Sequence, residues 1–246
     1  MTKPDAKGRY PRISLSRRAR KCGRSPLKSK IEKTMKIICI GRNYAAHAEE
    51  LQHNVGLTEA ADAAEPLWFL KPDTALLRNN DPFYIPAFSQ EVHYECELVV
   101  RIDRVGRAIA EKFARRYYHE VGLGIDFTAR DLQREAIARG LPWERAKAFD
   151  RSAALSPVFV PLDELGGDVQ KLRFELAVND EVRQRGDTRD MRFTVDRIIA
   201  AVSRYTTLRM GDLIYTGTPA GVGPVAPGDC LRATLEGREL LNFDIR

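Results

Sequence analysis

Two glutamates lie two positions apart in a stretch that otherwise predicts a strand. β-Branched and aromatic residues predominate in this segment, residues 91–100 (EVHYECELVV). Side chains alternate between the faces of a strand, so Glu95 and Glu97 would share one face with His93. Two like charges on a core-like strand are costly unless a cation neutralises them. The pair therefore indicates either an oxygen-ligated Mg²⁺ or Mn²⁺ site or the wet face of a half-buried strand.

A third carboxylate, Asp126, stands between an apolar stretch and a predicted helix over 128–139. At the end of a strand it would face a cleft and help the two glutamates to coordinate a divalent cation. Asp is also a favoured N-cap residue, so it would alternatively begin the helix. Arg130 and Gln133 lie three apart on that helix and share a face. They would hold a substrate carboxylate there, or form a solvated helix face.

Three further side chains suit charge stabilisation or proton transfer. Lys147, beside a metal, would stabilise negative charge on a bound oxygen; otherwise it is a surface lysine. His47 and Glu50 lie three apart in a predicted helix over 44–54. They would form either a general base for water, with the carboxylate orienting the imidazole, or an ordinary surface pair.

A loop rich in glycine and proline, residues 215–224 (YTGTPAGVGP), follows a predicted strand. Its irregular backbone would present amide N–H groups and the Thr218 hydroxyl to an anion. It lacks the Gly-Lys-Ser/Thr ending of a P-loop, so nucleotide binding is not predicted.

Short strands separated by glycine and proline turns dominate the chain after Met35. Strands are predicted over 66–70, 83–85, 91–100, 121–125, 158–161, 174–178 and within 212–246. Helices are predicted over 44–54, 108–118, 128–139 and 194–206. There is no βαβ alternation, so the pattern indicates an α+β fold with a mixed, strand-rich sheet and not a doubly wound one.

Charge divides the chain into two predicted parts. Residues 1–34 hold twelve Lys or Arg against two acidic residues, a net +10, so the overall +6 leaves −4 on the other 212 residues. We expect 1–34 to be a basic, poorly ordered tail and 35–246 a single domain. An acidic domain argues against nucleic-acid binding except through the basic tail.

Bulk composition narrows the class of protein. Hydrophobic residues make up 43% and charged residues 30% of the chain, as in soluble globular proteins. No apolar run has the length of a membrane span, which predicts no membrane association. The four cysteines are scattered without a C-x-x-C pair, so neither a zinc site nor a disulfide framework is indicated. A cytoplasmic location is expected.

Taken in order, these motifs resemble the fumarylacetoacetate hydrolase family, and within it the acylpyruvase/oxaloacetate decarboxylase branch. The motifs are GRNY with HxxE (41–50), FLKP (69–72), HYExE (93–97), DxTARDxQ (126–133), AKxFD (146–150) and TGTPxGVGP (216–224). The resemblance covers the chain from about Met35 onward. It implies a rolled, mixed β-sheet with flanking helices, a single catalytic domain and a homodimer.

Carried over position by position, the resemblance implies a metal site, a catalytic group and a substrate-binding group. The implied metal ligands are Glu95, Glu97 and Asp126. The implied catalytic residues are His47, Glu50 and Lys147. The implied substrate-binding residues are Arg130, Gln133, Thr218, Lys71 and Arg42.

The resemblance implies a hydrolase dependent on Mg²⁺ or Mn²⁺ that cleaves a C–C bond of acylpyruvates, for example fumarylpyruvate or acetylpyruvate. The products would be pyruvate and a carboxylic acid. Oxaloacetate decarboxylation, and isomerisation or tautomerisation of a related 2-oxo acid, pass through the same enolate and remain alternatives. A reading from another class is a nucleic-acid-associated protein that binds through its basic tail.

Overall fold

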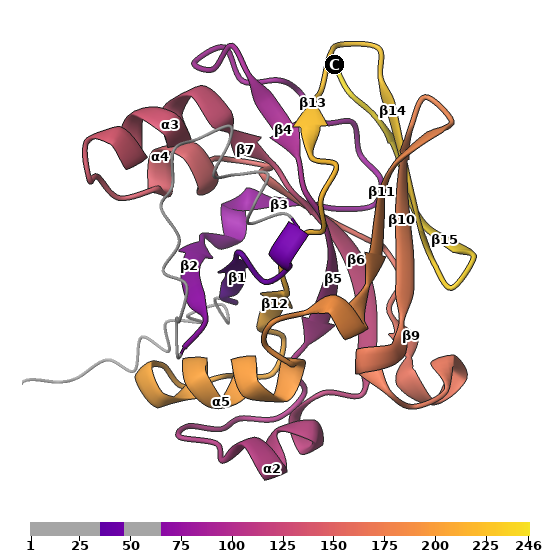
Figure 1. Ribbon diagram of the computed structural model, residues 1–246. Coiled ribbons are helices and arrows are strands. Elements are labelled where there is room, and N and C mark those ends of the chain that lie inside the picture. The colour runs from indigo at the N-terminus through magenta and orange to yellow at the C-terminus, as the bar shows by residue number, and fades with distance from the viewer. Residues whose placement is uncertain (1–34, 47–64) are drawn as a thin grey trace, which may run out of the picture. The chain divides into compact units, whose positions relative to one another are not determined.

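An eight-stranded mixed sheet forms the centre of the domain (Figure 1). The computed structural model describes residues 35–46 and 65–246. Along the sheet the order is β2-β1-β12-β5-β6-β8-β3, and β9 pairs with β6. Its strands are β1 (Ile37–Gly41), β2 (Leu67–Lys71), β3 (Leu76–Leu77), β5 (Cys96–Arg101), β6 (Glu120–Asp126), β8 (Ala153–Leu155), β9 (Val160–Pro161) and β12 (Leu213–Tyr215).

Two smaller sheets contain the other strands of the described residues. A four-stranded sheet has the order β11-β10-β14-β15 and a three-stranded sheet the order β13-β4-β7. Their strands are β4 (Val92–Tyr94), β7 (Thr128–Ala129), β10 (Arg173–Val178), β11 (Glu181–Asp187), β13 (Gly223–Pro224), β14 (Cys230–Leu235) and β15 (Arg238–Asp244). Most neighbours are antiparallel, but β1–β12 and β3–β8 are parallel. The predicted strand-rich α+β class is confirmed.

In the described part of the chain, the α-helices α2 to α5 and several 3₁₀ turns flank the sheets (Figure 1). The α-helices are α2 (Glu111–Ala114), α3 (Arg130–Ala138), α4 (Glu144–Lys147) and α5 (Val195–Tyr205). The 3₁₀ turns are η1 (Asp73–Ala75), η2 (Arg115–Tyr117), η3 (Leu162–Leu165), η4 (Val169–Lys171) and η5 (Thr188–Asp190).

Helix α5 matches its prediction to within a residue at each end. Thr194 caps it, since the Thr194 hydroxyl accepts a hydrogen bond from the Arg197 N–H. Its apolar face, including Ile198 and Val202, is fully buried. The helix predicted over 108–118 is much shorter. Ala108 has a positive φ of 49° and Ala110 is extended, so α2 starts only at Glu111.

The strand predicted over 91–100 is in fact two strands that belong to different sheets. It breaks at Glu95, where β4 of the three-stranded sheet gives way to β5 of the large sheet. The neighbouring chain segment makes the same change just after Asp126, the last residue of β6, because β6 pairs with β5 and β7 pairs with β4. The Asp126 N–H donates to the Glu95 carbonyl across this corner at 2.8 Å. Two of the three predicted metal ligands therefore lie where the chain passes from one sheet to another.

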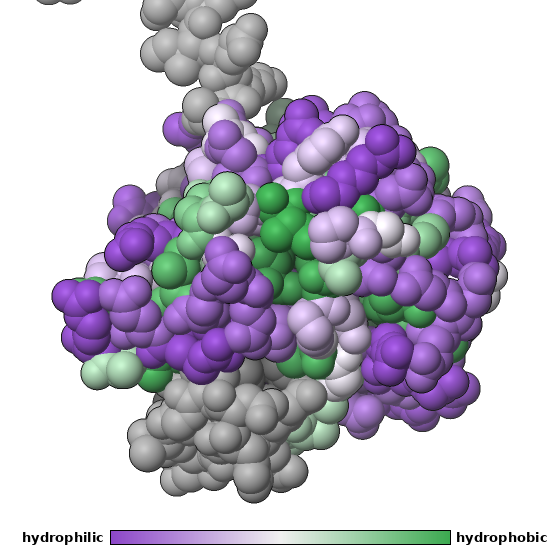
Figure 2. All heavy atoms as spheres, turned by 90° about the horizontal axis from the view of Figure 1, so that it is seen from above, coloured by the Kyte–Doolittle hydropathy of each residue, from purple (hydrophilic) through white to green (hydrophobic). Residues whose placement is uncertain are grey.

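Most of the domain surface seen from above is hydrophilic (Figure 2). Figure 2 shows an exception, since apolar side chains reach the surface in the middle of the face seen from above. Within the described ranges, no helix is both long and apolar enough to cross a membrane.

Candidate metal centre and active site

Three carboxylates converge at the corner between the sheets. One oxygen each of Glu95, Glu97 and Asp126 lies within 4.8 Å of the others, and the three residues are at most 5% exposed. Burial raises the pKa of Glu97 well above its ordinary value, and the charges of Asp126 and Glu95 raise it further. Such a crowded, all-oxygen donor set fits a hard divalent cation. The group is therefore able to hold a metal ion, and the wet-strand alternative is excluded.

Asp126 is not the N-cap of the following helix. Helix α3 begins at Arg130, and its N-cap is Ala129. The Asp126 side chain instead faces the two glutamates and two lysines. The alternative capping role suggested by its sequence position is wrong, since β7 separates it from the helix.

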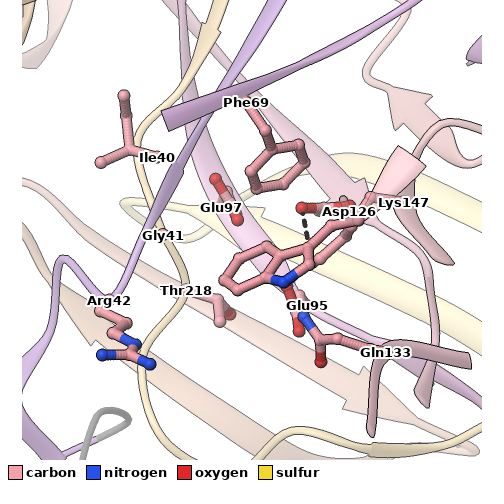
Figure 3. Close-up of a pocket in the computed structure, with 11 residues that line it drawn as sticks. Ile40, Gly41, Arg42, Phe69, Glu95, Glu97, Asp126, Gln133, Lys147 and Thr218 are labelled. Atoms are coloured by element: carbon pink, nitrogen blue, oxygen red, sulfur yellow. Dashed lines mark hydrogen bonds and ion pairs between the residues drawn. The ribbon is translucent and has the colours of Figure 1, made fainter. Parts of the chain in front are cut away.

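Lys147 is buried among the carboxylates and is not a surface residue. Its Nζ lies 2.7 Å from Glu95 Oε2 and 2.9 Å from Asp126 Oδ2 (Figure 3). Burial alone would lower the pKa of Lys147, but the charges of Asp126 and Glu95 outweigh it and raise the pKa. The side chain is therefore a fixed cation at the cavity wall.

Lys71 supports the cluster from outside the cavity. Its Nζ lies 2.7 Å from Asp126 Oδ1 and donates to Ser152 Oγ at 2.9 Å. It also donates to the carbonyl oxygens of Phe127, Lys147 and Ser152. Lys71 does not line the cavity, so its position suits the holding of Asp126 and not the predicted contact with substrate.

Arg130 and Gln133 are buried, which excludes the solvated helix face for these two residues. Arg130 Nη2 donates to Glu95 Oε1 at 2.6 Å, and Nη1 donates to Gln133 Oε1 at 2.5 Å. The arginine thus lies behind Glu95 and outside the cavity lining, whereas Gln133 lines the cavity. Because the carbonyl of Gln133 is engaged by Arg130, its NH₂ group is what it offers to a ligand.

The loop after β12 does present a backbone N–H group to a carboxyl group, but that group is the side chain of Glu97. The Gly217 N–H donates to Glu97 Oε2 at 2.6 Å. Gly217 has a φ of +99°, and a Cβ there would lie 2.7 Å from Asn43 Cβ, so only glycine fits. Asn43 is fully buried and holds the loop through a 2.8 Å bond from Nδ2 to the Thr216 carbonyl.

The cavity beside the carboxylates has an aromatic wall that the sequence did not reveal. The rings of Phe69 and Trp143 meet edge to face, with centroids 6.1 Å apart, and Lys147 Nζ lies 5.2 Å from the Phe69 centroid. A wall of this kind excludes water and strengthens charge interactions inside. The lining residues are Ile40, Gly41, Arg42, Phe69, Glu95, Glu97, Asp126, Gln133, Trp143, Lys147 and Thr218 (Figure 3).

The predicted general base cannot be placed. His47 and Glu50 lie outside the described residues, so their roles stay predictions. Phe69 could have been found from sequence, because it lies two positions before Lys71 in strand β2 and so shares the face of that residue. Trp143 carried no such signal, since it precedes a helix of one turn.

The fold and the cluster together define the class of protein. It is a strand-rich α+β protein with a buried group of carboxylates able to hold a metal ion. Residues 36–245 match the family described as fumarylacetoacetate (FAA) hydrolase C-terminal. The chain belongs to the fumarylacetoacetate hydrolase family and is an enzyme of that family.

Relatives refine this placement. The chain is 41% identical over 210 residues to the mitochondrial oxaloacetate tautomerase FAHD1 of Mus musculus. The aligned residues cover 85% of this chain and 91% of the relative. It is 39% identical over 212 residues to a mitochondrial oxaloacetate decarboxylase of Dictyostelium discoideum, at 85% and 93% coverage. The crystal structure of fumarylpyruvate hydrolase from Pseudomonas aeruginosa, in complex with Mn²⁺ and pyruvate, superposes with a TM-score of 0.77. Its sequence is 34% identical to this chain, and the match covers 85% of this chain and 88% of the hydrolase chain. The predicted branch of the family is confirmed, and the relatives favour the alternative activities over acylpyruvate hydrolysis.

Proposed function

We propose that this chain is a divalent-metal-dependent enzyme that acts on oxaloacetate and interconverts its keto and enol forms. The observation that carries the proposal is the buried group of Glu95, Glu97 and Asp126 with the Lys147 cation beside it, at the wall of one cavity. The similarity to an oxaloacetate tautomerase over most of both chains supports the choice of substrate.

The chemistry requires stabilisation of one negatively charged oxygen. Loss of a C3 proton from oxaloacetate leaves an electron pair that moves onto the C2 oxygen, and protonation of this oxygen gives the enol. Lys147 would donate a hydrogen bond to that oxygen as charge develops, in a site from which water is largely excluded. A Mg²⁺ or Mn²⁺ ion held by the three carboxylates would supply a second positive charge there.

Two further cavity residues suit the carboxylates of such a diacid. Gln133 offers an amide NH₂ group, and Arg42 offers a guanidinium group. In Figure 3 these two side chains lie on opposite sides of Thr218. They would bind the two ends of the substrate, while Arg130 and Lys71 hold Glu95 and Asp126 in place.

Decarboxylation of oxaloacetate is the second candidate, favoured by the decarboxylase among the relatives. In that reaction the C3–C4 bond breaks, CO₂ leaves, and the electron pair remains as the enolate of pyruvate, which is then protonated. Neither reaction consumes water. Acylpyruvate hydrolysis does, and the predicted water-activating residues His47 and Glu50 would be needed for it. The Mn²⁺ and pyruvate complex of the fumarylpyruvate hydrolase is what keeps hydrolysis as a third candidate.

The test is an assay of the full chain with oxaloacetate, in which the enol is followed by its ultraviolet absorbance. We expect Mg²⁺ or Mn²⁺ to support rapid loss of the enol, a chelator to abolish it, and added metal to restore it. Pyruvate release from oxaloacetate and from a panel of acylpyruvates is measured in parallel. Faster turnover of an acylpyruvate than of either oxaloacetate reaction would replace this proposal by the hydrolase.

A homodimer and a cytoplasmic location, both expected from the sequence, are part of the proposal. The two relatives are named as mitochondrial proteins, so a mitochondrial location is the alternative to a cytoplasmic one. Fluorescence of a tagged full chain in its own cells would decide between the two compartments.

A further inference from the structure

A buried glutamine beside the carboxylates was not predicted as part of the site. Gln184 belongs to β11 of the four-stranded sheet and is 1% exposed. Its Oε1 accepts from the Cys96 N–H at 2.9 Å, and its Nε2 donates to Thr218 Oγ1 at 2.8 Å and to the Pro219 carbonyl at 2.9 Å. One side-chain amide therefore joins three segments of the chain: β11, the start of β5 and the loop after β12.

The hydrogen-bonding partners of Gln184 determine which atom of its amide is the oxygen and which is the nitrogen. The Cys96 N–H can only donate and the Pro219 carbonyl can only accept, so Oε1 and Nε2 of Gln184 are not interchangeable. Thr218 Oγ1 accepts from Nε2, and its own proton goes to the Cys96 carbonyl at 2.8 Å. The three residues thus form a closed ring of hydrogen bonds in which each bond strengthens the next.

The ring restricts what the Thr218 hydroxyl can do. Its proton is used by the Cys96 carbonyl and one lone pair by Gln184, so one lone pair remains. Thr218 lines the cavity, and there its hydroxyl can act only as a hydrogen-bond acceptor. It therefore suits an O–H donor such as an enol hydroxyl or a water, and not the substrate carboxylate predicted from sequence.

The ring also fixes the two peptide groups on either side of Cys96, which join it to Glu95 and to Glu97. Both the N–H and the carbonyl of Cys96 are bound within it. Glu95 and Glu97 are the residues on either side, and their oxygens must stay close to each other and to Asp126. Buried partners that orient metal-binding groups commonly govern how tightly the metal is held.

We propose that Gln184 is a positioning residue: its amide sets the spacing of Glu95 and Glu97 for a divalent cation and makes the Thr218 hydroxyl an acceptor facing the cavity. The inference rests on the proposed function for its turnover readout only. Binding of Mn²⁺ is measured without substrate and tests the positioning role directly.

The test compares Gln184→Met with the matched control Gln170→Met. The Gln170 amide also joins separate segments, through 2.8 Å bonds to the Thr188 carbonyl and from the Val195 N–H, but neither of these partners lines the cavity, whereas Thr218 does. Mn²⁺ affinity of the full chain is titrated by electron paramagnetic resonance, and Tm, kcat and KM for oxaloacetate are measured. We expect Gln184→Met to weaken Mn²⁺ binding about 10- to 100-fold and to lower kcat. Gln170→Met should lower Tm but leave Mn²⁺ affinity at the wild-type value.

A second pair of variants covers the case in which Gln184→Met fails to fold. Thr218→Ser keeps the hydroxyl and should keep Mn²⁺ affinity, whereas Thr218→Val opens the ring and should weaken it as Gln184→Met does. Wild-type Mn²⁺ affinity in either Gln184→Met or Thr218→Val would overturn the positioning role. Wild-type chain that binds Mn²⁺ but does not turn over oxaloacetate would overturn the proposed function alone.

Discussion

At the scale of single residues, Lys147 is the clearest case of a side chain whose role depends on its surroundings. Two carboxylates within 2.9 Å keep its ammonium charged although it is only 3% exposed. Because the pKa of Lys147 is raised in the fold, its stabilising contribution is complete below the ordinary lysine value of 10.5 and is lost only as pH rises through the raised pKa. At neutral pH the cation is therefore fully present to meet a developing negative charge.

Replacement of this cation should separate catalysis from overall folding. Lys147→Met keeps the length of the side chain but removes the charge, so we expect kcat for oxaloacetate to fall about 10²- to 10³-fold. Breaking a buried charge cluster also destabilises, by about 3–5 kcal/mol. Steady-state kinetics and urea unfolding measure the two effects. Lys171→Met, which removes an exposed lysine paired with Asp168, is the control and should change neither. Wild-type kcat in Lys147→Met would refute the assigned role.

At the scale of elements, the site depends on the corner where two paired ribbons change sheets. Strands β5 and β6 pair in the large sheet, and β4 and β7 continue the pairing in the small one. Glu95 at one break and Asp126 at the end of β6 are thereby brought together with Glu97, the second residue of β5. The loop after β12 closes the arrangement by binding Glu97 through the Gly217 N–H.

That loop can be tested with two glycines that both have a positive φ. Gly217 and Gly211 have φ of +99° and +91°, but only at Gly217 would a Cβ meet another atom, Asn43 Cβ at 2.7 Å. Alanine at either position should cost about 1–3 kcal/mol of backbone strain. Gly217→Ala should in addition displace the N–H from Glu97 and weaken Mn²⁺ binding, whereas Gly211→Ala should not. Equal Mn²⁺ affinity in the two variants, from the same titration, would show that the loop does not position Glu97.

At the scale of the whole molecule, the boundary of the basic segment coincides with the start of the match to the family. The match to the family begins at residue 36, just after the basic segment 1–34 ends. The predicted homodimer belongs to the same scale, and the apolar surface in Figure 2 is of the kind through which proteins associate. Light scattering on the full chain in solution would show a mass of two copies if the dimer forms.

The basic segment should be separable from the catalytic function. A chain that begins at Met35 should turn over oxaloacetate at the rate of the full chain, because every described site residue lies after that point. Nucleic-acid binding, measured at several salt concentrations, should be confined to the full chain and should weaken steeply with salt. Loss of turnover on deletion would show that the segment serves the enzyme. If the chain that begins at Met35 also binds nucleic acid in a salt-dependent way, the basic segment 1–34 is not what binds it.

The α+β class and the amphipathic helix α5 could be predicted from local periodicity, and the family and the acidic triad from the types and order of residues in its motifs. The sequence did not predict that the strand 91–100 breaks at Glu95, because both halves have the same alternating pattern and only their pairing partners differ. It also did not predict that Arg130 binds Glu95 behind the cavity, or that Gln184 completes a ring with Thr218. Those roles depend on hydrogen bonds between residues far apart in the chain, so only the tertiary structure, which brings the atoms within reach, could decide them.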